Sequence, residues 1–147
     1  MIQRIQTLFL LLAGAAFAAL LVYPFATSAP SGSDMQNIFA DGSYSIQDNL
    51  MLEILVLAGI LLSFVNIFLF KKRKIQMRIG YLLMILSILI PLVAYLYFTN
   101  QVSTLSDAPV QDGPGVFLPI ASLVFAILAN YFIRKDEKIV RSMDRLR

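Results

Sequence analysis

The chain has 147 residues, of which 59% are hydrophobic and 14% are charged, and its formal net charge is +3. That hydrophobic fraction exceeds the roughly 45–50% that is usual in soluble domains, and the length accommodates one domain. Cysteine and histidine are both absent. Their absence excludes disulfides, zinc sites with Cys or His ligands, histidine-ligated haem and Ser-His or Cys-His nucleophilic catalysis.

The charges are distributed very unevenly along the chain. All twelve basic residues lie in three places, at Arg4, in the run Lys71 to Arg78 and in the tail from Arg134 to Arg147. The two intervening loops carry only acidic charges, at Asp34, Asp41, Asp48, Asp107 and Asp112. Because Lys and Arg are retained on the cytoplasmic side, we expect a multi-pass protein of the bacterial inner membrane with both termini in the cytoplasm.

Four apolar stretches are long enough to cross a bilayer, whose core of about 30 Å requires roughly 20 residues of helix. We therefore expect a single all-α domain over residues 1–147, a four-helix transmembrane bundle with spans at about 5–25, 50–70, 79–98 and 116–133. The small residues Ala26-Thr27-Ser28-Ala29 after the first stretch are also typical of a signal-peptide cleavage site. The apolar length of that stretch favours a retained span.

The first outer loop contains a turn signal. Asp41-Gly42 lies between two short apolar runs, residues 38–40 and 44–46, and Asp-Gly favours hairpin turns that require positive φ. We therefore expect a small β-hairpin in this loop. Asp48 is expected to cap the second helix, and Glu53 suits the positive end of that helix dipole better than a proton pathway.

The second half of the chain contains two further structural signals. Pro91 should kink the third span, and the second outer loop contains residues that disfavour both helix and central strand, namely Pro109, Gly113, Pro114 and Gly115. The tail, residues 134–147, is expected to form a short basic cytoplasmic helix, because its apolar residues make one stripe. This helix would either continue the fourth span into the cytoplasm or bend to lie along the headgroups. Its interspersed acidic residues exceed what topology requires, so we expect it to dock on the 71–78 loop or on a partner protein.

Two groups of residues are candidate contact sites. Asn66, Asn130 and Ser63 are expected to make polar contacts between helices, because an amide in hydrocarbon needs a partner. The structural interpretation is a hydrogen bond between the second and fourth helices, and the alternative is a ligand or ion contact. The second group consists of basic residues suited to anionic lipid or a partner protein: Lys71, Lys72, Arg73, Lys74, Arg78, Arg134, Lys135, Arg141, Arg145 and Arg147.

Three segments resemble a known family: MIQRIQT at residues 1–7, KKRKIQMR at 71–78 and RKDEKIVRSMDRLR at 134–147. They are similar to the corresponding segments of a Bacteroidota integral membrane family, the domain of unknown function 4293 (DUF4293). The resemblance extends over the whole chain in length and span arrangement. It implies a four-span inner-membrane protein with a retained first helix, and it transfers no catalytic or binding residue to this chain.

The function expected from the sequence is that of a non-enzymatic accessory or assembly component of a membrane complex. Membrane lipids and another membrane protein are the expected partners. No catalytic residue, cofactor or metal is expected, and no nucleic acid, because no aromatic platform accompanies the basic charge. The alternative is a carrier or binder of a lipid or small apolar molecule, which would need an apolar cavity beside Pro91 and Asn66. An enzyme is the third interpretation, and it would require the loop aspartates to converge.

Overall fold

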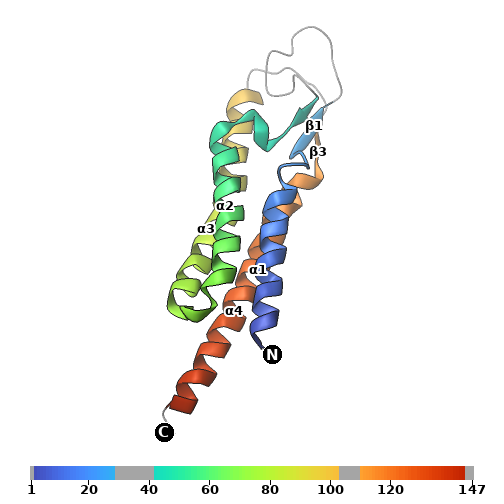
Figure 1. The fold of residues 1–147 in the computed structure, drawn as a ribbon. Helices are drawn as coiled ribbons and strands as arrows, with labels where there is room; N and C mark the ends of the chain where they lie inside the picture. Colours follow the sequence, from blue (N-terminus) through green and yellow to red (C-terminus); the bar gives the residue numbers. More distant parts are fainter. Residues whose placement is uncertain (1, 29–41, 103–109, 145–147) are drawn as a thin grey trace.

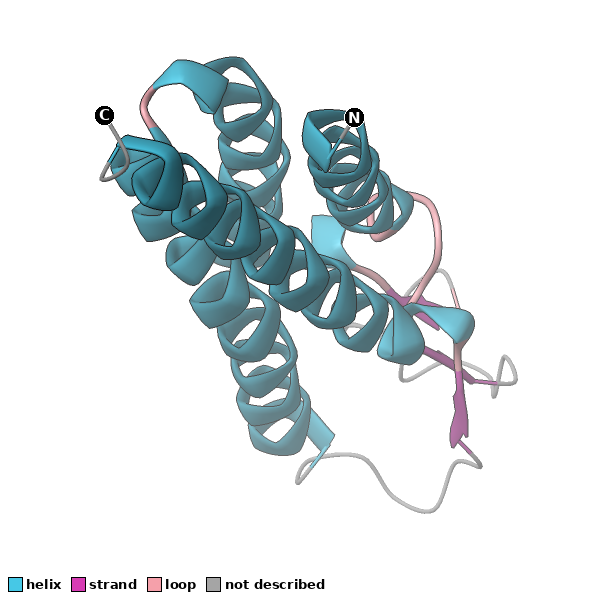
Figure 2. Ribbon diagram, turned by 90° about the horizontal axis from the view of Figure 1, so that it is seen from below, coloured by secondary structure: helices cyan, strands magenta, loops and turns pink. Residues whose placement is uncertain are grey.

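Four helices run side by side and a small sheet lies at one end of them (Figure 1). The computed structural model describes residues 2–28, 42–102 and 110–144. Figure 2 shows the helices in a view turned by 90°. Their bounds are α1 Ile2–Ala19, α2 Leu50–Phe68, α3 Arg73–Val102 and α4 Leu118–Asp144.

Three helical segments are long and apolar enough to cross a membrane: Leu50–Lys71, Arg73–Asn100 and Pro114–Val140. Large apolar side chains cover their outer faces. Phe68 of α2 is 76% exposed and Ile88 of α3 is 58% exposed. The outer face of a soluble bundle would be polar, so this surface suits contact with lipid.

The first helix is shorter than the predicted span at 5–25. α1 ends at Ala19, and its 18 residues extend about 27 Å at 1.5 Å per residue. Leu20 and Leu21 continue in a tighter turn, in which Leu20 N–H donates to Phe17 O at 3.2 Å. Pro24 then follows and has no N–H to donate. The expectation of four equivalent spans is therefore corrected to three long helices and one shorter apolar helix.

In the described part of the chain the tail continues α4, which is one of the two arrangements expected for it. α4 runs without interruption from Leu118 to Asp144, and its last turns project beyond the connection between α2 and α3 (Figure 1). Pro119 is its second residue, where a missing N–H costs little. α1 begins and α4 ends at the same end of the bundle as this connection (Figure 1), and we call this end the basic end.

Three short strands form an antiparallel sheet with the order β2-β1-β3. Their bounds are β1 Ala26–Ser28, β2 Ser43–Tyr44 and β3 Val110–Asp112. Ala26 lies opposite Tyr44 on one side and opposite Asp112 on the other. The sheet therefore joins the two loops that connect the helices at this end, which we call the sheet end.

The predicted hairpin is only partly consistent with this sheet. Gly42 has a φ of 76°, which is the backbone conformation that an Asp-Gly turn requires. However, Tyr44 pairs with Ala26 at the start of the same loop, and residues 38–40, which were expected to form the other strand, lie outside the described residues. The cap of α2 is also shifted by one residue, because Asn49 accepts from Met51 N–H at 2.8 Å while Asp48 accepts from Ser45 N–H.

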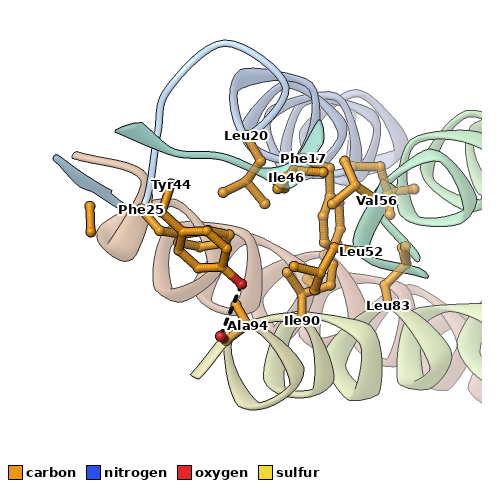
Figure 3. Close-up of a cluster of buried hydrophobic side chains, with 14 residues drawn as sticks. Phe17, Leu20, Phe25, Tyr44, Ile46, Leu52, Val56, Leu83, Ile90 and Ala94 are labelled. Atoms are coloured by element: carbon orange, nitrogen blue, oxygen red, sulfur yellow. Dashed lines mark hydrogen bonds between the residues drawn. The ribbon is translucent and has the colours of Figure 1, made fainter. Parts of the chain in front are cut away.

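The core lies between the helices and continues to the sheet end (Figure 3). Phe17, Leu52 and Ile90 are fully buried there. Small residues allow α1 and α2 to approach closely, since a Cβ at Gly14 would lie 3.2 Å from Ser63 Cβ. Between α3 and α4, Ser122 Oγ donates to Ser87 Oγ at 2.8 Å. Both contacts agree with the close packing that small residues allow in membrane helices.

Candidate functional site

A cavity of about 340 Å³ lies at the sheet end, between α3, the sheet and the turn that precedes α4. Most of its lining is apolar or aromatic, and it consists of Phe25, Ala26, Tyr44, Pro91, Ala94, Tyr95, Phe98, Asp112 and Val116. Its volume falls within the roughly 300–1,000 Å³ of small-molecule sites. The alternative interpretation of the sequence required a cavity beside Pro91, and this one lies there. Asn66, which was expected beside the same cavity, is not among its lining residues.

Tyr44 forms part of the inner wall of this cavity. Its side chain is 2% exposed, and its hydroxyl donates to the backbone oxygen of Ala94 in α3 at 3.0 Å (Figure 3). The rings of Phe25 and Phe98 are both in tilted contact with the Tyr44 ring, with centroids 6.0 and 5.9 Å from its own. Tyr44 therefore ties the sheet to α3 just beyond Pro91, which α3 passes without a break.

The same burial changes the acidity of this side chain. Burial, together with the smaller effects of the nearby charges of Asp48 and Tyr97, raises the pKa of the Tyr44 hydroxyl from 10.0 to about 12. The neutral hydroxyl is the form that donates to Ala94 O. Its contribution to stability is therefore complete below pH 10 and is lost as the pH rises through about 12.

Replacing the hydroxyl should reveal both effects. We expect Tyr44→Phe to lower the free energy of unfolding by about 0.5–1.5 kcal/mol at pH 7, because it removes one buried hydrogen bond. We also expect the variant to lose less stability than the parent protein between pH 10 and 12. Circular dichroism of thermal unfolding in a neutral detergent measures both quantities, and parallel pH curves for the two proteins would contradict the assignment.

A second polar feature lies in the interior near the basic end. Each of the four helices contributes one buried carboxamide there: Gln6, Asn66, Gln76 and Asn130. Gln6 and Gln76 lie near the starts of α1 and α3, and each donates from Nε2 to a backbone oxygen of the adjacent helix. The acceptors are Phe132 O at 3.2 Å for Gln6 and Asn66 O at 3.1 Å for Gln76.

The hydrogen bond expected between Asn66 of α2 and Asn130 of α4 does not form between these two described side chains. Asn130 Nδ2 donates to Met77 O of α3 at 3.4 Å, and a Cβ on Gly80 would lie only 3.0 Å from the Asn130 amide. The side chain of Asn66 is fully buried and has no hydrogen-bond partner among the described residues. Because α3 lacks a side chain at Gly80, Asn130 packs against that helix and so reaches α3 instead of α2.

Ser63 takes part in helix packing but not through a hydrogen bond between helices. Its Oγ donates to Gly59 O of its own helix at 2.9 Å, while its Cβ lies against Gly14 of α1. Gln6 and Gln76 are not among the contact residues expected from the sequence. The available signal was a polar amide in each of the two IQ-containing segments, next to a strongly apolar stretch.

An open groove of about 970 Å³ lies at the basic end, between the α2–α3 connection and the projecting part of α4. We call it the basic groove. Its lining residues are Phe70, Lys71, Lys72, Arg73, Lys74, Ile75, Glu137 and Val140. Arg73 contacts α4 twice, with Nη2 2.9 Å from Asp136 Oδ2 and Nη1 donating to Asp136 O at 3.3 Å. The expected docking of the tail on the 71–78 loop is thus present within the chain.

The other basic candidates lie outside this groove. Arg78 and Lys135 are exposed, and the guanidinium of Arg134 lies over the ring of Tyr81, 5.2 Å from its centroid. Arg145 and Arg147 lie outside the described residues, as does the side chain of Arg141.

The loop aspartates do not supply a catalytic cluster within the described part of the chain. Asp48 accepts from Ser45 N–H and Asp112 lies in β3 at the rim of the sheet-end cavity. The other three, Asp34, Asp41 and Asp107, lie outside the described residues. No group of three or more Asp, Glu, His or Cys side chains suited to a metal ion occurs among the residues that the structure describes.

These features define a helical membrane protein with an apolar cavity at one end and a basic groove at the other. The chain belongs to the family described as "Domain of unknown function (DUF4293)", whose model matches residues 2–146. This confirms the family resemblance of the three basic segments. No curated protein and no solved structure matches the chain.

Proposed function

We propose that this protein binds a lipid chain or another small apolar molecule in the sheet-end cavity, without catalysing a reaction on it. The observation that supports the proposal is the cavity itself, an apolar space of about 340 Å³ beside Pro91. Ligand sites are typically concave, largely apolar and supplied with a few polar groups. Here Asp112 supplies a polar group at the edge.

The position of the cavity favours a ligand that is dissolved in the membrane. Tyr95 lines the cavity and is 65% exposed on α3, so one wall borders the apolar outer surface of the bundle. Tyr residues are enriched where a membrane meets water. An apolar molecule could therefore enter from the lipid without crossing water.

A substitution that fills the cavity tests this proposal. Ala94 lines the cavity and is almost fully buried, and we expect the ring of Ala94→Phe to occupy the space of the ligand. The protein purified in mild detergent should retain an apolar molecule, detected by native mass spectrometry, and Ala94→Phe should lose most of it. Ala15→Phe provides a matched control, because Ala15 is exposed on α1. Equal retention by both variants, or no retained molecule at all, would exclude the cavity as the site.

A second candidate function is that of an accessory or assembly component of a membrane complex, at the inner membrane with both termini in the cytoplasm. The projecting end of α4, which Arg73 anchors through Asp136, favours this candidate because it presents a fixed helical surface to a partner. We expect removal of residues 134–147, with two or three terminal lysines kept for orientation, to abolish co-purification of a partner complex. Unchanged stability, localisation and co-purifying proteins would exclude this function.

A further inference from the structure

We propose that the basic groove is a binding site for the phosphate headgroup of an anionic phospholipid. The groove is built by two segments that are far apart in the sequence, the α2–α3 connection and the projecting part of α4. It lies at the opposite end of the bundle from the sheet-end cavity. Its occupation is therefore independent of the function proposed for that cavity.

The charge of the groove suits a phosphate group. Four of its lining residues are basic and one, Glu137, is acidic. Asp136 lies beside the groove and pairs with Arg73, so an excess of positive charge remains on the lysines at 71, 72 and 74. α3 also begins at Arg73, and the N-terminus of a helix attracts anions through its dipole and its backbone N–H groups.

The apolar part of the lining distinguishes a lipid from a free anion. Phe70, Ile75 and Val140 line the groove together with the basic residues, and Phe70 remains 47% exposed. A phospholipid presents apolar carbon next to its phosphate, and a free phosphate ion does not. Phe70 also directly follows the apolar stretch of α2, which places the groove at the depth where the headgroups of a bilayer lie.

The ion pair with α4 gives the groove a fixed second wall. Arg73 contacts both the carboxylate and the backbone oxygen of Asp136, and these two side chains are only 22% and 14% exposed. Glu137 and Val140 follow Asp136 on the same helix and line the groove. Arg73 therefore has a positioning role, while the exposed lysines are left to contact the ligand. This division of roles exceeds what membrane orientation requires, because orientation depends on charge and not on a shaped groove.

Binding of short-chain lipids to the intact protein tests the proposal. The protein in a neutral detergent would be titrated with dioctanoyl phosphatidylglycerol, with dioctanoyl phosphatidylcholine and with inorganic phosphate, and bound lipid would be counted by native mass spectrometry. We expect phosphatidylglycerol to bind at least tenfold more tightly than phosphatidylcholine. Lys71→Gln/Lys74→Gln should weaken phosphatidylglycerol binding about tenfold or more. The reason is that each basic residue close to anionic lipid adds to the electrostatic attraction, and this variant removes two of them.

The matched control removes the same charge elsewhere at the same end. Lys135 and Lys138 are exposed on α4 and do not line the groove, so Lys135→Gln/Lys138→Gln should weaken binding less than twofold. Circular dichroism would verify that both variants remain folded. An equal loss in the two variants would assign the effect to overall charge and overturn the proposal. Equal binding of the two lipids, or equally tight binding of inorganic phosphate, would also overturn it.

Discussion

Single cysteines introduced at Gln111 and at Ser142 should react from opposite sides of the membrane. Gln111 lies in β3 at the sheet end and Ser142 lies near the end of α4, and both side chains are exposed. The basic residues at the α4 end should hold it in the cytoplasm. In intact spheroplasts, a membrane-impermeant maleimide should therefore label Gln111→Cys almost completely and Ser142→Cys almost not at all.

The chain itself makes this experiment simple to interpret. It contains no cysteine, so each introduced thiol is the only one and the parent protein is the blank. Permeabilised membranes should label both variants equally, which controls for reactivity. Labelling of both residues from the same side would contradict the charge argument and the proposed location of both termini.

Gly115→Ala should strongly destabilise the protein. A Cβ at Gly115 would lie 2.5 Å from Pro24 O and 2.7 Å from Tyr23 O, and Gly115 N–H donates to the same Pro24 O at 2.9 Å. These neighbours are backbone atoms, which cannot rotate away as a side chain could. We expect the variant to lose about 3 kcal/mol in the free energy of unfolding, at the upper end of the cost of overpacking.

Thermal unfolding followed by circular dichroism in detergent would measure this loss. Val124→Ala is a suitable control because Val124 is 48% exposed on α4, and surface substitutions usually change stability by less than about 0.5 kcal/mol. A Gly115→Ala variant as stable as this control would show that the 23–25 segment can move away from the start of α4. The close contact of Gly115 with the 23–25 segment would then not be essential to the stability of the fold.

The buried amides show how a membrane bundle combines apolar packing with polar contacts. Gln6 and Gln76 each reach a backbone oxygen of an adjacent helix, whereas both polar atoms of the Asn66 side chain lack a partner in the part of the chain that the structure describes. A buried polar group without a partner costs about 1–3 kcal/mol. Asn66 is therefore a position where the packing of the helices does not satisfy every polar group.

Much of the helical framework was predictable from the sequence alone. The stretches at 50–70 and 79–98 fall inside α2 with its following turn and inside α3, and the stretch at 116–133 falls inside α4 with its preceding turn. They are predictable because a spanning helix satisfies its backbone groups internally and needs only a long apolar run. The first span was overestimated, since apolar residues continue to Phe25 while α1 ends at Ala19. Hydropathy measures polarity and does not detect where the backbone turns before Pro24.

The two candidate sites also differ in how far the sequence predicts them. The basic groove was partly predictable, because four consecutive basic residues and a mixed-charge tail can be recognised in the sequence. The ion pair of Arg73 with Asp136 belongs to one of the two alternatives that the tail-docking hypothesis left open. The cavity at the sheet end was expected only under the hypothesis that the protein carries or binds a lipid or small apolar molecule. Five of its lining residues, Phe25, Ala26, Tyr44, Asp112 and Val116, come from three separate segments, and no local pattern relates them.

The sequence by itself determined the membrane character, the long helices and the segregation of positive charge, because apolar length and the placement of Lys and Arg are properties of a linear chain. The tertiary structure alone decided that Ala26 pairs with both Tyr44 and Asp112. It also decided that Asn130 contacts α3 at Gly80 rather than Asn66. Such contacts depend on which helices are neighbours and how closely they approach. That arrangement is set when all four helices pack against one another at the same time, and the sequence of any one helix does not specify it.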